Sequence, residues 1–225
     1  MQRMRETKAG PDGGAGEDRP AAAGEVVLYG AGSPLIVDVE ESCAAAGLRI
    51  LAIIRNVEGP VHALRSDLVV PEEEADPALL TRPVLLPMFG PASRRAALAA
   101  LSRRLGGRAP RGAVLADPHA RIPASTRLEA GAYVNAGVVI GAAGRIGAWA
   151  LINRGATLGH HCELAPFASV GPGAVCAGST TIGEGAVIGA GAVIGPGVRV
   201  GAGAAVAPGA VLRKDLPDGA VAAAA

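Results

Sequence analysis

The chain has very few aromatic residues: one Trp, two Tyr and two Phe among 225 residues. The formal net charge is only +1, and no basic cluster is present. A protein that binds nucleic acid uses basic side chains for phosphates and aromatic rings for base stacking. We therefore expect no nucleic-acid partner.

Cysteine is also scarce, because Cys43, Cys162 and Cys176 are the only ones. Three thiols are too few for a disulfide framework, which favours a reducing, cytoplasmic location. Residues 1–24 are rich in Gly, Ala and charge and contain no continuous apolar stretch. We expect a disordered tail there, with neither a signal peptide nor a membrane span.

What the chain does contain is a repeat of six residues. An aliphatic or cysteine residue recurs at every sixth position, and a small residue usually follows four positions later. The recurring positions are Ile122, Leu128, Val134, Ile140, Ile146, Ile152, Leu158, Leu164, Val170, Cys176, Ile182, Ile188, Ile194, Val200 and Val206. A period of six fits neither an amphipathic helix nor a helical solenoid.

The repeat predicts a parallel β-helix. Residues two apart in a strand face the same side, so each hexapeptide contributes one inward pair, and Gly, Pro, Asn and Ala between the pairs allow corners. Three units close a triangular coil of eighteen residues, and fifteen units give five stacked coils. The inward positions include Cys162 and Cys176, which act there as small apolar residues.

The segment before the repeat predicts a small parallel-sheet domain. Residues 25–32 read as a buried strand that ends in a glycine turn, 34–46 as a helix and 48–54 as a second strand. Further on we expect a strand at 83–88, a helix at 93–105 capped by Ser93, and a last strand at 113–116. The Glu72–Glu74 run is expected to be a solvated loop or a helix start.

The glycine turn, formed by Gly30, Ala31, Gly32 and Ser33, stands where parallel sheets bind phosphates. The dinucleotide fingerprint is incomplete, because Leu35 stands at the third glycine position and no acidic residue ends the second strand. This argues against a nicotinamide dehydrogenase. A mononucleotide or sugar-nucleotide pocket and a purely structural tight turn both stay open.

Two adjacent histidines, His160 and His161, follow the inward Leu158. Only the first and fifth positions of each hexapeptide fill the prism, so both imidazoles are expected at a corner, outside the core. Imidazole is the usual general base at neutral pH. Two polar residues that merely occupy a turn are the alternative interpretation.

The eighteen-residue coil predicts which residues stack. Asn135 and Asn153 are one coil apart, and Ala142 and Gly178 flank His160. Small residues on both sides leave space around the imidazole. Ser169, further along the coil, could offer a hydroxyl. Corner capping by Asn153 and simple solvation of Ser169 are the alternatives.

Three stretches resemble one known family: Val-Leu-Tyr-Gly-Ala-Gly (27–32), Ile-Asn-Arg-Gly-Ala-Thr-Leu-Gly-His-His-Cys (152–162) and Val-Gly-Pro-Gly-Ala-Val-Cys-Ala-Gly (170–178), with Gly90 and Arg94 between them. The chain resembles the sialic-acid O-acetyltransferase and bacillosamine-type amino-sugar N-acetyltransferase family over about residues 25–219. The resemblance implies a left-handed β-helix and a homotrimer.

It also implies acetyl-CoA as co-substrate, a sugar or nucleotide-sugar acceptor, and no metal. By this resemblance His160 is the general base, Asn153 contacts the acceptor, and the Gly178 backbone lies against the pantetheine arm. Ser169 replaces a second histidine that family members carry near the thioester, which implies that Ser169 lies beside the coenzyme.

The chain departs from the family pattern beside the base. His161 stands where many members carry Asp or Glu, so His161 itself, Glu163 or a neighbouring chain would have to support His160. Ser33-Pro34 replaces a Gly-His pair, Arg55 replaces an acidic residue, and the chain ends in Ala-Val-Ala-Ala-Ala-Ala where a Gly-x-Pro-Ala loop is usual.

The sequence therefore predicts a disordered tail (1–24), an α/β nucleotide-binding-like domain (25–117), a β-helix acyltransferase domain (118–213) and a C-terminal tail (214–225). A non-catalytic trimeric β-helix that binds a nucleotide or a partner is the alternative function. A zinc hydratase of the γ-carbonic-anhydrase kind needs three spread histidines, which adjacent His160 and His161 do not supply. The sugar, and O- against N-transfer, stay open.

Overall fold

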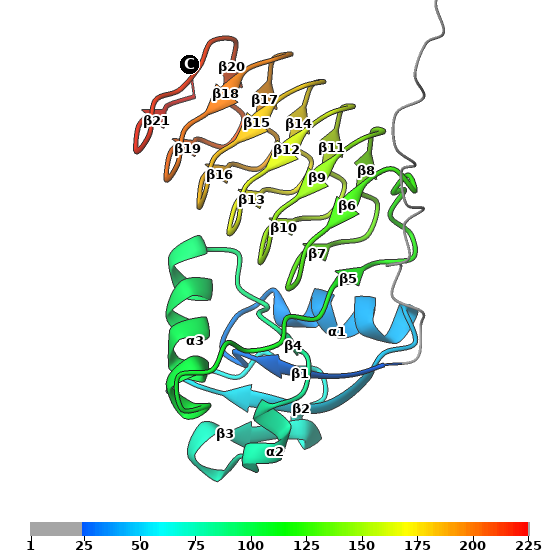
Figure 1. The fold of residues 1–225 in the computed structure, drawn as a ribbon, viewed down its shortest axis with the longest axis vertical. Helices are drawn as coiled ribbons and strands as arrows, with labels where there is room; N and C mark the ends of the chain where they lie inside the picture. Colours follow the sequence, from blue (N-terminus) through cyan, green and yellow to red (C-terminus); the bar gives the residue numbers. More distant parts are fainter. Residues whose placement is uncertain (1–23, 225) are drawn as a thin grey trace, which may run out of the picture.

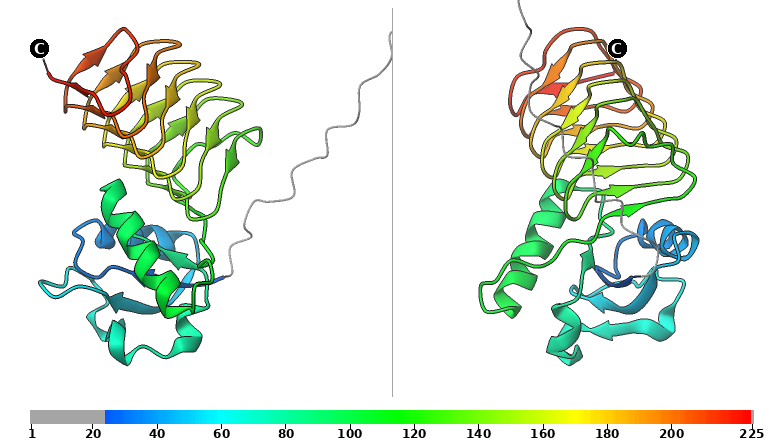
Figure 2. Two further views of the ribbon diagram at one scale, coloured as in Figure 1. Left: turned by 60° about the vertical axis from the view of Figure 1, so that its left-hand side comes forward. Right: turned by 45° about the vertical axis from the view of Figure 1, so that its right-hand side comes forward.

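The computed structural model describes residues 24–224, so nearly all of the predicted disordered tail lies outside the described residues. The described chain forms a small α/β domain and a parallel β-helix that extends away from it (Figure 1; Figure 2). None of the helices in this part of the chain is long and apolar enough to cross a membrane.

The small domain contains a parallel four-stranded sheet in the order β3-β2-β1-β4. Its strands are β1 (Glu25–Tyr29), β2 (Arg49–Arg55), β3 (Val69–Pro71) and β4 (Val84–Leu85). Its helices are α1 (Ile36–Ala45), α2 (Pro77–Leu80) and α3 (Pro91–Arg104), with short 3-10 turns η1 (Ser66–Leu68) and η2 (Glu72–Glu74). The predicted strand, helix, strand unit is therefore present as β1, α1 and β2.

Strand β1 is buried from Val26 to Tyr29 because both faces of the sheet are covered. Val26 and Leu28 belong to the cluster that includes α1, whereas Val27 and Tyr29 belong to the cluster that includes α3. This alternation is what the two-residue period of a strand dictates. The sheet therefore has α1 on one side and α3 on the other.

The β-helix has three faces of parallel strands, each strand only two residues long. The first face has the order β21-β19-β16-β13-β10-β7-β5, the second β20-β17-β14-β11-β8, and the third β18-β15-β12-β9-β6. The first-face strands are β5 (Leu115–Ala116), β7 (Tyr133–Val134), β10 (Leu151–Ile152), β13 (Ser169–Val170), β16 (Val187–Ile188), β19 (Ala205–Val206) and β21 (Val221–Ala222). The second-face strands are β8 (Val139–Ile140), β11 (Thr157–Leu158), β14 (Val175–Cys176), β17 (Val193–Ile194) and β20 (Val211–Leu212). The third-face strands are β6 (Arg127–Leu128), β9 (Arg145–Ile146), β12 (Glu163–Leu164), β15 (Thr181–Ile182) and β18 (Arg199–Val200).

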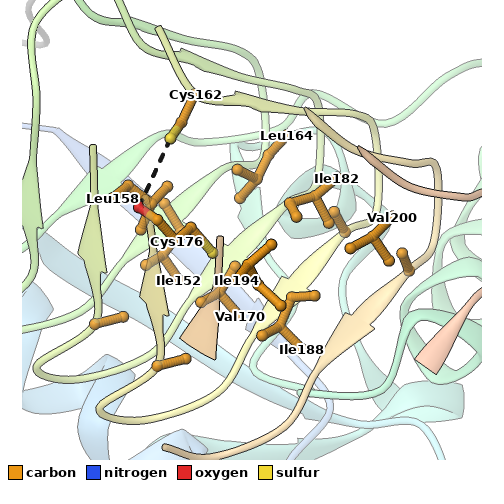
Figure 3. Close-up of a cluster of buried hydrophobic side chains, with 14 of the residues drawn as sticks. Ile152, Leu158, Cys162, Leu164, Val170, Cys176, Ile182, Ile188, Ile194 and Val200 are labelled. Atoms are coloured by element: carbon orange, nitrogen blue, oxygen red, sulfur yellow. Dashed lines mark hydrogen bonds between the residues drawn. The ribbon is translucent and has the colours of Figure 1, made fainter. Parts of the chain in front are cut away.

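The repeat positions fill the prism as predicted. Every recurring residue from Val134 to Val206 is at most 3% exposed, and they form one cluster with the small residues four positions later. Figure 3 shows these side chains converging, with the Cys162 thiol turned inward. Burial raises the pKa of the Cys176 thiol to about 12, so this sulfur stays protonated at neutral pH.

Each corner contains one residue in the left-handed region, three positions after the recurring residue. Glycine occupies most of these sites, but Ala143, Trp149, His161, Phe167 and Ser179 adopt φ values of 55–61°. A non-glycine residue in this region is strained, although the strain is smaller for His and Asn. The interlocked backbone hydrogen bonds between coils hold these corners in place.

The small domain covers the first face of the prism. Tyr133 and Leu151 lie in one core cluster with residues of α1, and Trp149 lies in the cluster of α3. An ion pair between Asp38 of α1 and Arg154 closes the other edge of this face. Strands β8, β11 and β14 lie on the side away from the small domain (Figure 1).

Several predicted boundaries were wrong. Helix α3 begins at Pro91 and not at Ser93, and Gly90 precedes it without a side-chain cap, because proline at the first position already sets the helical φ. The strand at 83–88 is reduced to Val84–Leu85.

The ends of the β-helix also differ from expectation. The strand predicted at 113–116 is Leu115–Ala116, and it pairs with β7 of the β-helix. Residues expected to form a C-terminal tail instead continue the coil: Leu216 bridges Val200, and β21 pairs with β19. Leu216 and Ala222 are partly buried against the β-helix core, and this burial keeps the segment on the prism.

Candidate active site

His160 and His161 lie at the corner between β11 on the second face and β12 on the third face. Both residues are exposed. The His161 N–H donates to the Ala142 carbonyl at 2.9 Å, and the Ser179 N–H donates to the His160 carbonyl at 2.8 Å. The predicted stack of residues 142, 160 and 178 is therefore confirmed, since these bonds join the three coils at this corner.

The two imidazoles contact each other directly. Their Nδ1 atoms are 3.0 Å apart, and the rings meet edge to face with centroids 5.2 Å apart. A hydrogen bond between two Nδ1 atoms requires one to carry the proton and the other a lone pair. Within the described chain, Nε2 of His160 has no hydrogen-bond partner, so this nitrogen is open to a substrate.

Gly178 lies directly against the His160 ring. A β-carbon placed on Gly178 would be 2.7 Å from both Cε1 and Nε2 of His160. The φ of Gly178 is not in the left-handed region, so the imidazole, and not the backbone, requires glycine here. Its N–H donates to no acceptor in residues 24–224. A free imidazole nitrogen therefore lies beside a residue whose amide N–H is also free.

Glu163 follows on β12, where its neighbours in the ladder are Arg145 and Thr181. The residue is exposed. In the part of the chain that the structure describes, its carboxylate makes no hydrogen bond or ion pair. A supporting contact from Glu163 to His160 is therefore not made within the single chain.

Asn153 lies at a different corner, between β10 and β11. Its Oδ1 accepts hydrogen bonds from Asn135 Nδ2 at 2.9 Å and from the Arg154 N–H at 2.8 Å. The predicted stacking of the two asparagines is confirmed. Asn153 is only 8% exposed, and one chain does not bring it together with His160.

Ser169 lies on the first face, beneath the small domain, and is completely buried. Its Oγ donates to the Phe89 carbonyl at 2.7 Å and accepts from Arg94 Nη2 at 2.9 Å. The hydroxyl therefore joins the two domains, and its predicted place beside the coenzyme stays a prediction.

Arg94 is a buried cation without a carboxylate partner among residues 24–224. Its guanidinium instead donates at 2.6–2.9 Å to the carbonyls of Met88, Phe89, Trp149 and Phe167 and to Ser169 Oγ. Burial, with a smaller contribution from nearby Arg95, lowers its pKa to about 10. Residue type and spacing alone gave no indication of this set of contacts, because its acceptors are mainly backbone atoms of distant segments.

The small domain contains a cavity of about 620 Å³ at the carboxyl ends of β1 and β2. The glycine turn, the end of β2 and one side of α3 line it; the lining residues include Gly30, Gly32, Ser33, Asn56, Met88, Phe89 and Ala96. The predicted turn residues therefore face a real cavity. Ala31 is the exception, since it is buried and is not among the lining residues.

Asn56 is the polar feature of this cavity that sequence reasoning missed. Its Oδ1 is buried and has no hydrogen-bond partner in the part of the chain that the structure describes. A buried carbonyl oxygen without a donor costs about 1–3 kcal/mol, so a ligand N–H or O–H would find an unpaired acceptor there. The sequence showed only that the residue after β2 is not acidic.

The cavity and His160 do not meet within one chain. The small domain covers the first face of the prism, whereas His160 lies at the corner where the second and third faces meet, which is the corner opposite to the first face. In one chain the cavity and His160 therefore lie on opposite sides of the first coils of the β-helix. No group of three or more His, Cys, Asp or Glu residues in the described chain could hold a metal ion.

Comparison with known proteins defines the class. Residues 179–214 match the family model described as bacterial transferase hexapeptide (six repeats). The structure resembles a histidine variant of GDP-perosamine N-acetyl transferase from Caulobacter crescentus with CoA and GDP-perosamine bound, at 30% identity and a TM-score of 0.76, covering 90% of this chain and 94% of that one.

It also resembles the acetyltransferase domain of PglB from Neisseria gonorrhoeae FA1090 in complex with acetyl coenzyme A, at 26% identity and a TM-score of 0.75, covering 88% and 95% of the two chains. WeeI from Acinetobacter baumannii AYE, at 20% identity and a TM-score of 0.68 over 87% and 94%, shares the fold. No curated protein matches the sequence.

The fold and the repeat thus define a hexapeptide-repeat acyltransferase with a left-handed β-helix. Within that class, the chain belongs to the family of sugar N-acetyltransferases that includes the Caulobacter enzyme. The resemblance inferred from the sequence is confirmed, and the protein is an acetyltransferase.

Proposed function

We propose that the protein transfers an acyl group, the acetyl group of acetyl-CoA, to an amine or hydroxyl of a nucleotide-linked sugar, with His160 as general base. The observation that carries the proposal is the open Nε2 of His160 beside Gly178, whose N–H is free in the described chain. A base and an amide donor at one exposed corner are what direct acyl transfer requires.

The reaction needs no covalent enzyme intermediate. The acceptor nitrogen or oxygen attacks the thioester carbonyl carbon while its proton passes to Nε2 of His160. The carbonyl oxygen becomes an oxyanion, to which the Gly178 N–H donates. The C–S bond then breaks, CoA leaves as thiolate, and the thiolate takes up a proton. Binding both substrates at once supplies the proximity.

The cavity at Gly30, Gly32 and Ser33 is proposed to hold the nucleotide part of the acceptor. Its position at the carboxyl ends of parallel strands is the usual ligand position in such sheets. The unpaired Oδ1 of Asn56 offers an acceptor for a base or ribose donor. The Caulobacter relative was crystallised with GDP-perosamine, which supports a nucleotide sugar as the acceptor class.

A homotrimer is proposed to join the two halves of the site. Four of the five outward residues of the second face are exposed valines, Val139 (41% exposed), Val175 (38%), Val193 (38%) and Val211 (52%), and Thr157 lies between Val139 and Val175. The equivalent column of the third face is Arg127, Arg145, Glu163, Thr181 and Arg199. Exposed apolar columns of this kind favour a subunit interface, and this one borders the His160 corner.

In such a trimer, His160 of one chain would act on a sugar held by the cavity of a neighbouring chain. Co-expression of two inactive variants tests this arrangement. His160→Ala lacks the base, and Ala96→Trp fills the cavity from the exposed side of α3. Mixed trimers should recover about a quarter of wild-type activity, the fraction of interfaces with both halves intact. If the mixture stays inactive, a neighbour does not supply the cavity.

His160→Ala tests the catalytic role itself. Turnover with acetyl-CoA and a panel of nucleotide-linked amino sugars should fall at least about a hundredfold, the usual contribution of a general base. His119→Ala, at a histidine whose side chain is 77% exposed, is the matched control and should retain activity. Wild-type turnover in His160→Ala would contradict the proposal.

A non-catalytic trimer that binds a nucleotide is the alternative, favoured by the lack of a carboxylate beside His160. Calorimetry that detects nucleotide binding but no acetyl-CoA binding would support it. We also propose the cytoplasm as the location, because Cys43, Cys162 and Cys176 are free, buried thiols.

A further inference from the structure

We propose that His161 is the positioning residue for His160, and that it takes the place of a carboxylate by accepting a hydrogen bond at its own Nδ1. This inference rests on the proposed function, since it concerns the same site. The observation behind it is the 3.0 Å contact between the two Nδ1 atoms.

The contact allows only two arrangements of protons. A neutral imidazole has one N–H and one lone pair, so either His160 donates through Nδ1 or His161 does. When His160 donates, its Nε2 keeps the lone pair beside Gly178. When His161 donates, Nε2 of His160 carries the proton and cannot take another from the substrate. Only the first arrangement produces a base at the open position.

His161 is well fixed for this role. Its backbone adopts a φ of 55°, and its N–H is bonded to the Ala142 carbonyl at 2.9 Å. The charged groups on the flanking strands are Glu163 of β12 and Arg145 of β9. Neither makes a hydrogen bond or ion pair with the two imidazoles in the described chain, so His161 is the group that contacts His160.

A neutral acceptor orients the base without neutralising it. In a histidine–carboxylate pair the anion both sets the tautomer and stabilises the imidazolium that forms during the reaction. His161 supplies the first effect and less of the second. Exchange of His161 for Asp should therefore retain the tautomer and increase turnover.

The tautomer can be measured directly. In nitrogen-15 NMR spectra of selectively labelled wild-type protein, His160 should carry its proton on Nδ1. In His161→Ala that preference should be lost, and turnover should fall about ten- to hundredfold, the range for loss of a group that orients a histidine, with KM unchanged. Ala143 adopts φ 59° at the same corner one coil earlier, so alanine at 161 preserves the backbone.

Rescue and control variants separate orientation from packing. His161→Asn should restore the Nδ1 proton of His160 and most of the turnover, and His161→Asp should restore the same proton with turnover above the wild-type value, because both supply an acceptor oxygen and tolerate a left-handed φ. Glu163→Gln should change neither quantity. The proposal is overturned if wild-type His160 carries its proton on Nε2, or if Glu163→Gln reproduces the loss.

The two proposals can fail independently. Full activity in His160→Ala would refute the general base whatever the tautomer is. If His160→Ala is inactive but wild-type His160 carries its proton on Nε2, only the role of His161 is refuted.

Discussion

A β-carbon on Gly178 would lie 2.7 Å from Nε2 of His160, so any side chain at position 178 would clash with the imidazole of the coil before it. Other corners carry Ala, Arg, Pro or Glu at the equivalent position, for example Ala142, Arg154, Pro172 and Glu184. The backbone therefore accepts a side chain there, and only the histidine forbids one.

Gly178→Ala should reduce activity without unfolding the protein. The exposed imidazole can swing away from the new methyl group, so the free energy of unfolding should change by less than about 1 kcal/mol. The displaced Nε2 would lose its position beside the Gly178 N–H, and kcat should fall at least about tenfold. Steady-state kinetics and urea unfolding measure the two effects. Ala142→Gly, two coils earlier, is the control and should change neither; equal activity in Gly178→Ala would argue against catalysis at this corner.

The sequence alone predicted this corner well. A strict period of six residues determines which positions are buried, and its eighteen-residue coil determines which residues stack. The stacks of Asn135 on Asn153 and of Ala142, His160 and Gly178 follow from counting. No long-range information is needed, because each coil contacts only its neighbours.

The arrangement of the two domains could not be predicted in this way. The contacts of Arg94 with Trp149 and Ser169 join residues 55 and 75 positions apart, and four of the five close acceptors are backbone carbonyls that any residue provides. The unpaired Oδ1 of Asn56 likewise results from burial by distant segments. A periodic pattern reports which side of an element is apolar, but not which other element covers it.

Arg94 should be essential for the joint between the domains. Arg94→Lys retains the charge but replaces five N–H donors by three, so some of the buried carbonyls of Met88, Phe89, Trp149 and Phe167 lose their partner. The expected loss is at least about 3 kcal/mol of unfolding free energy, from two or more charged hydrogen bonds. Arg95→Lys, on the next residue, changes an exposed ion pair with Glu184 and should cost less than about 1 kcal/mol. Similar losses in both variants, by urea unfolding, would show that the buried contacts contribute little.

Asn56→Ala should have opposite effects on stability and on binding. Removal of an unpaired buried oxygen should stabilise the free protein by about 1 kcal/mol, measured as a higher midpoint of unfolding. Loss of the acceptor should weaken binding of the nucleotide sugar about tenfold, close to one hydrogen bond. Calorimetry with acetyl-CoA provides the control, because its affinity should not change. A variant that is less stable and binds the nucleotide normally would show that Asn56 has a structural role.

Asp117 should make the domain joint sensitive to acid. Burial favours its neutral form, but hydrogen bonds from Ser42 Oγ at 2.7 Å and from the N–H and ring of His119 outweigh burial and lower its pKa below the usual 3.8. A carboxylate with a lowered pKa stabilises the fold above its unfolded pKa, and this stabilisation is lost as the pH falls through the folded value.

The free energy of unfolding should therefore decrease as the pH falls below about 4. Urea unfolding from pH 7 to pH 3 measures this. Asp117→Asn should be less stable than the wild type at neutral pH, and its free energy of unfolding should decrease less in acid. His119→Ala serves as the comparison, since it removes only part of the hydrogen bonding. An unchanged acid dependence in Asp117→Asn would assign the sensitivity to other carboxylates.

Val193→Glu should separate the subunits of the proposed trimer. The valine lies in the middle of the exposed apolar column, between Val175 and Val211 in the ladder. A carboxylate buried there on association would lose its hydration without a partner, at a cost of several kcal/mol for each copy. Light scattering coupled to gel filtration should therefore give the monomer mass. Thr181→Glu, at the equivalent position of the third face, should leave the trimer intact.

Activity should also disappear in Val193→Glu, because in the proposed trimer the two halves of the site meet only between chains. Val193 itself is neither part of the His160 corner nor a lining residue of the cavity. An active monomer would show instead that one chain completes the site alone.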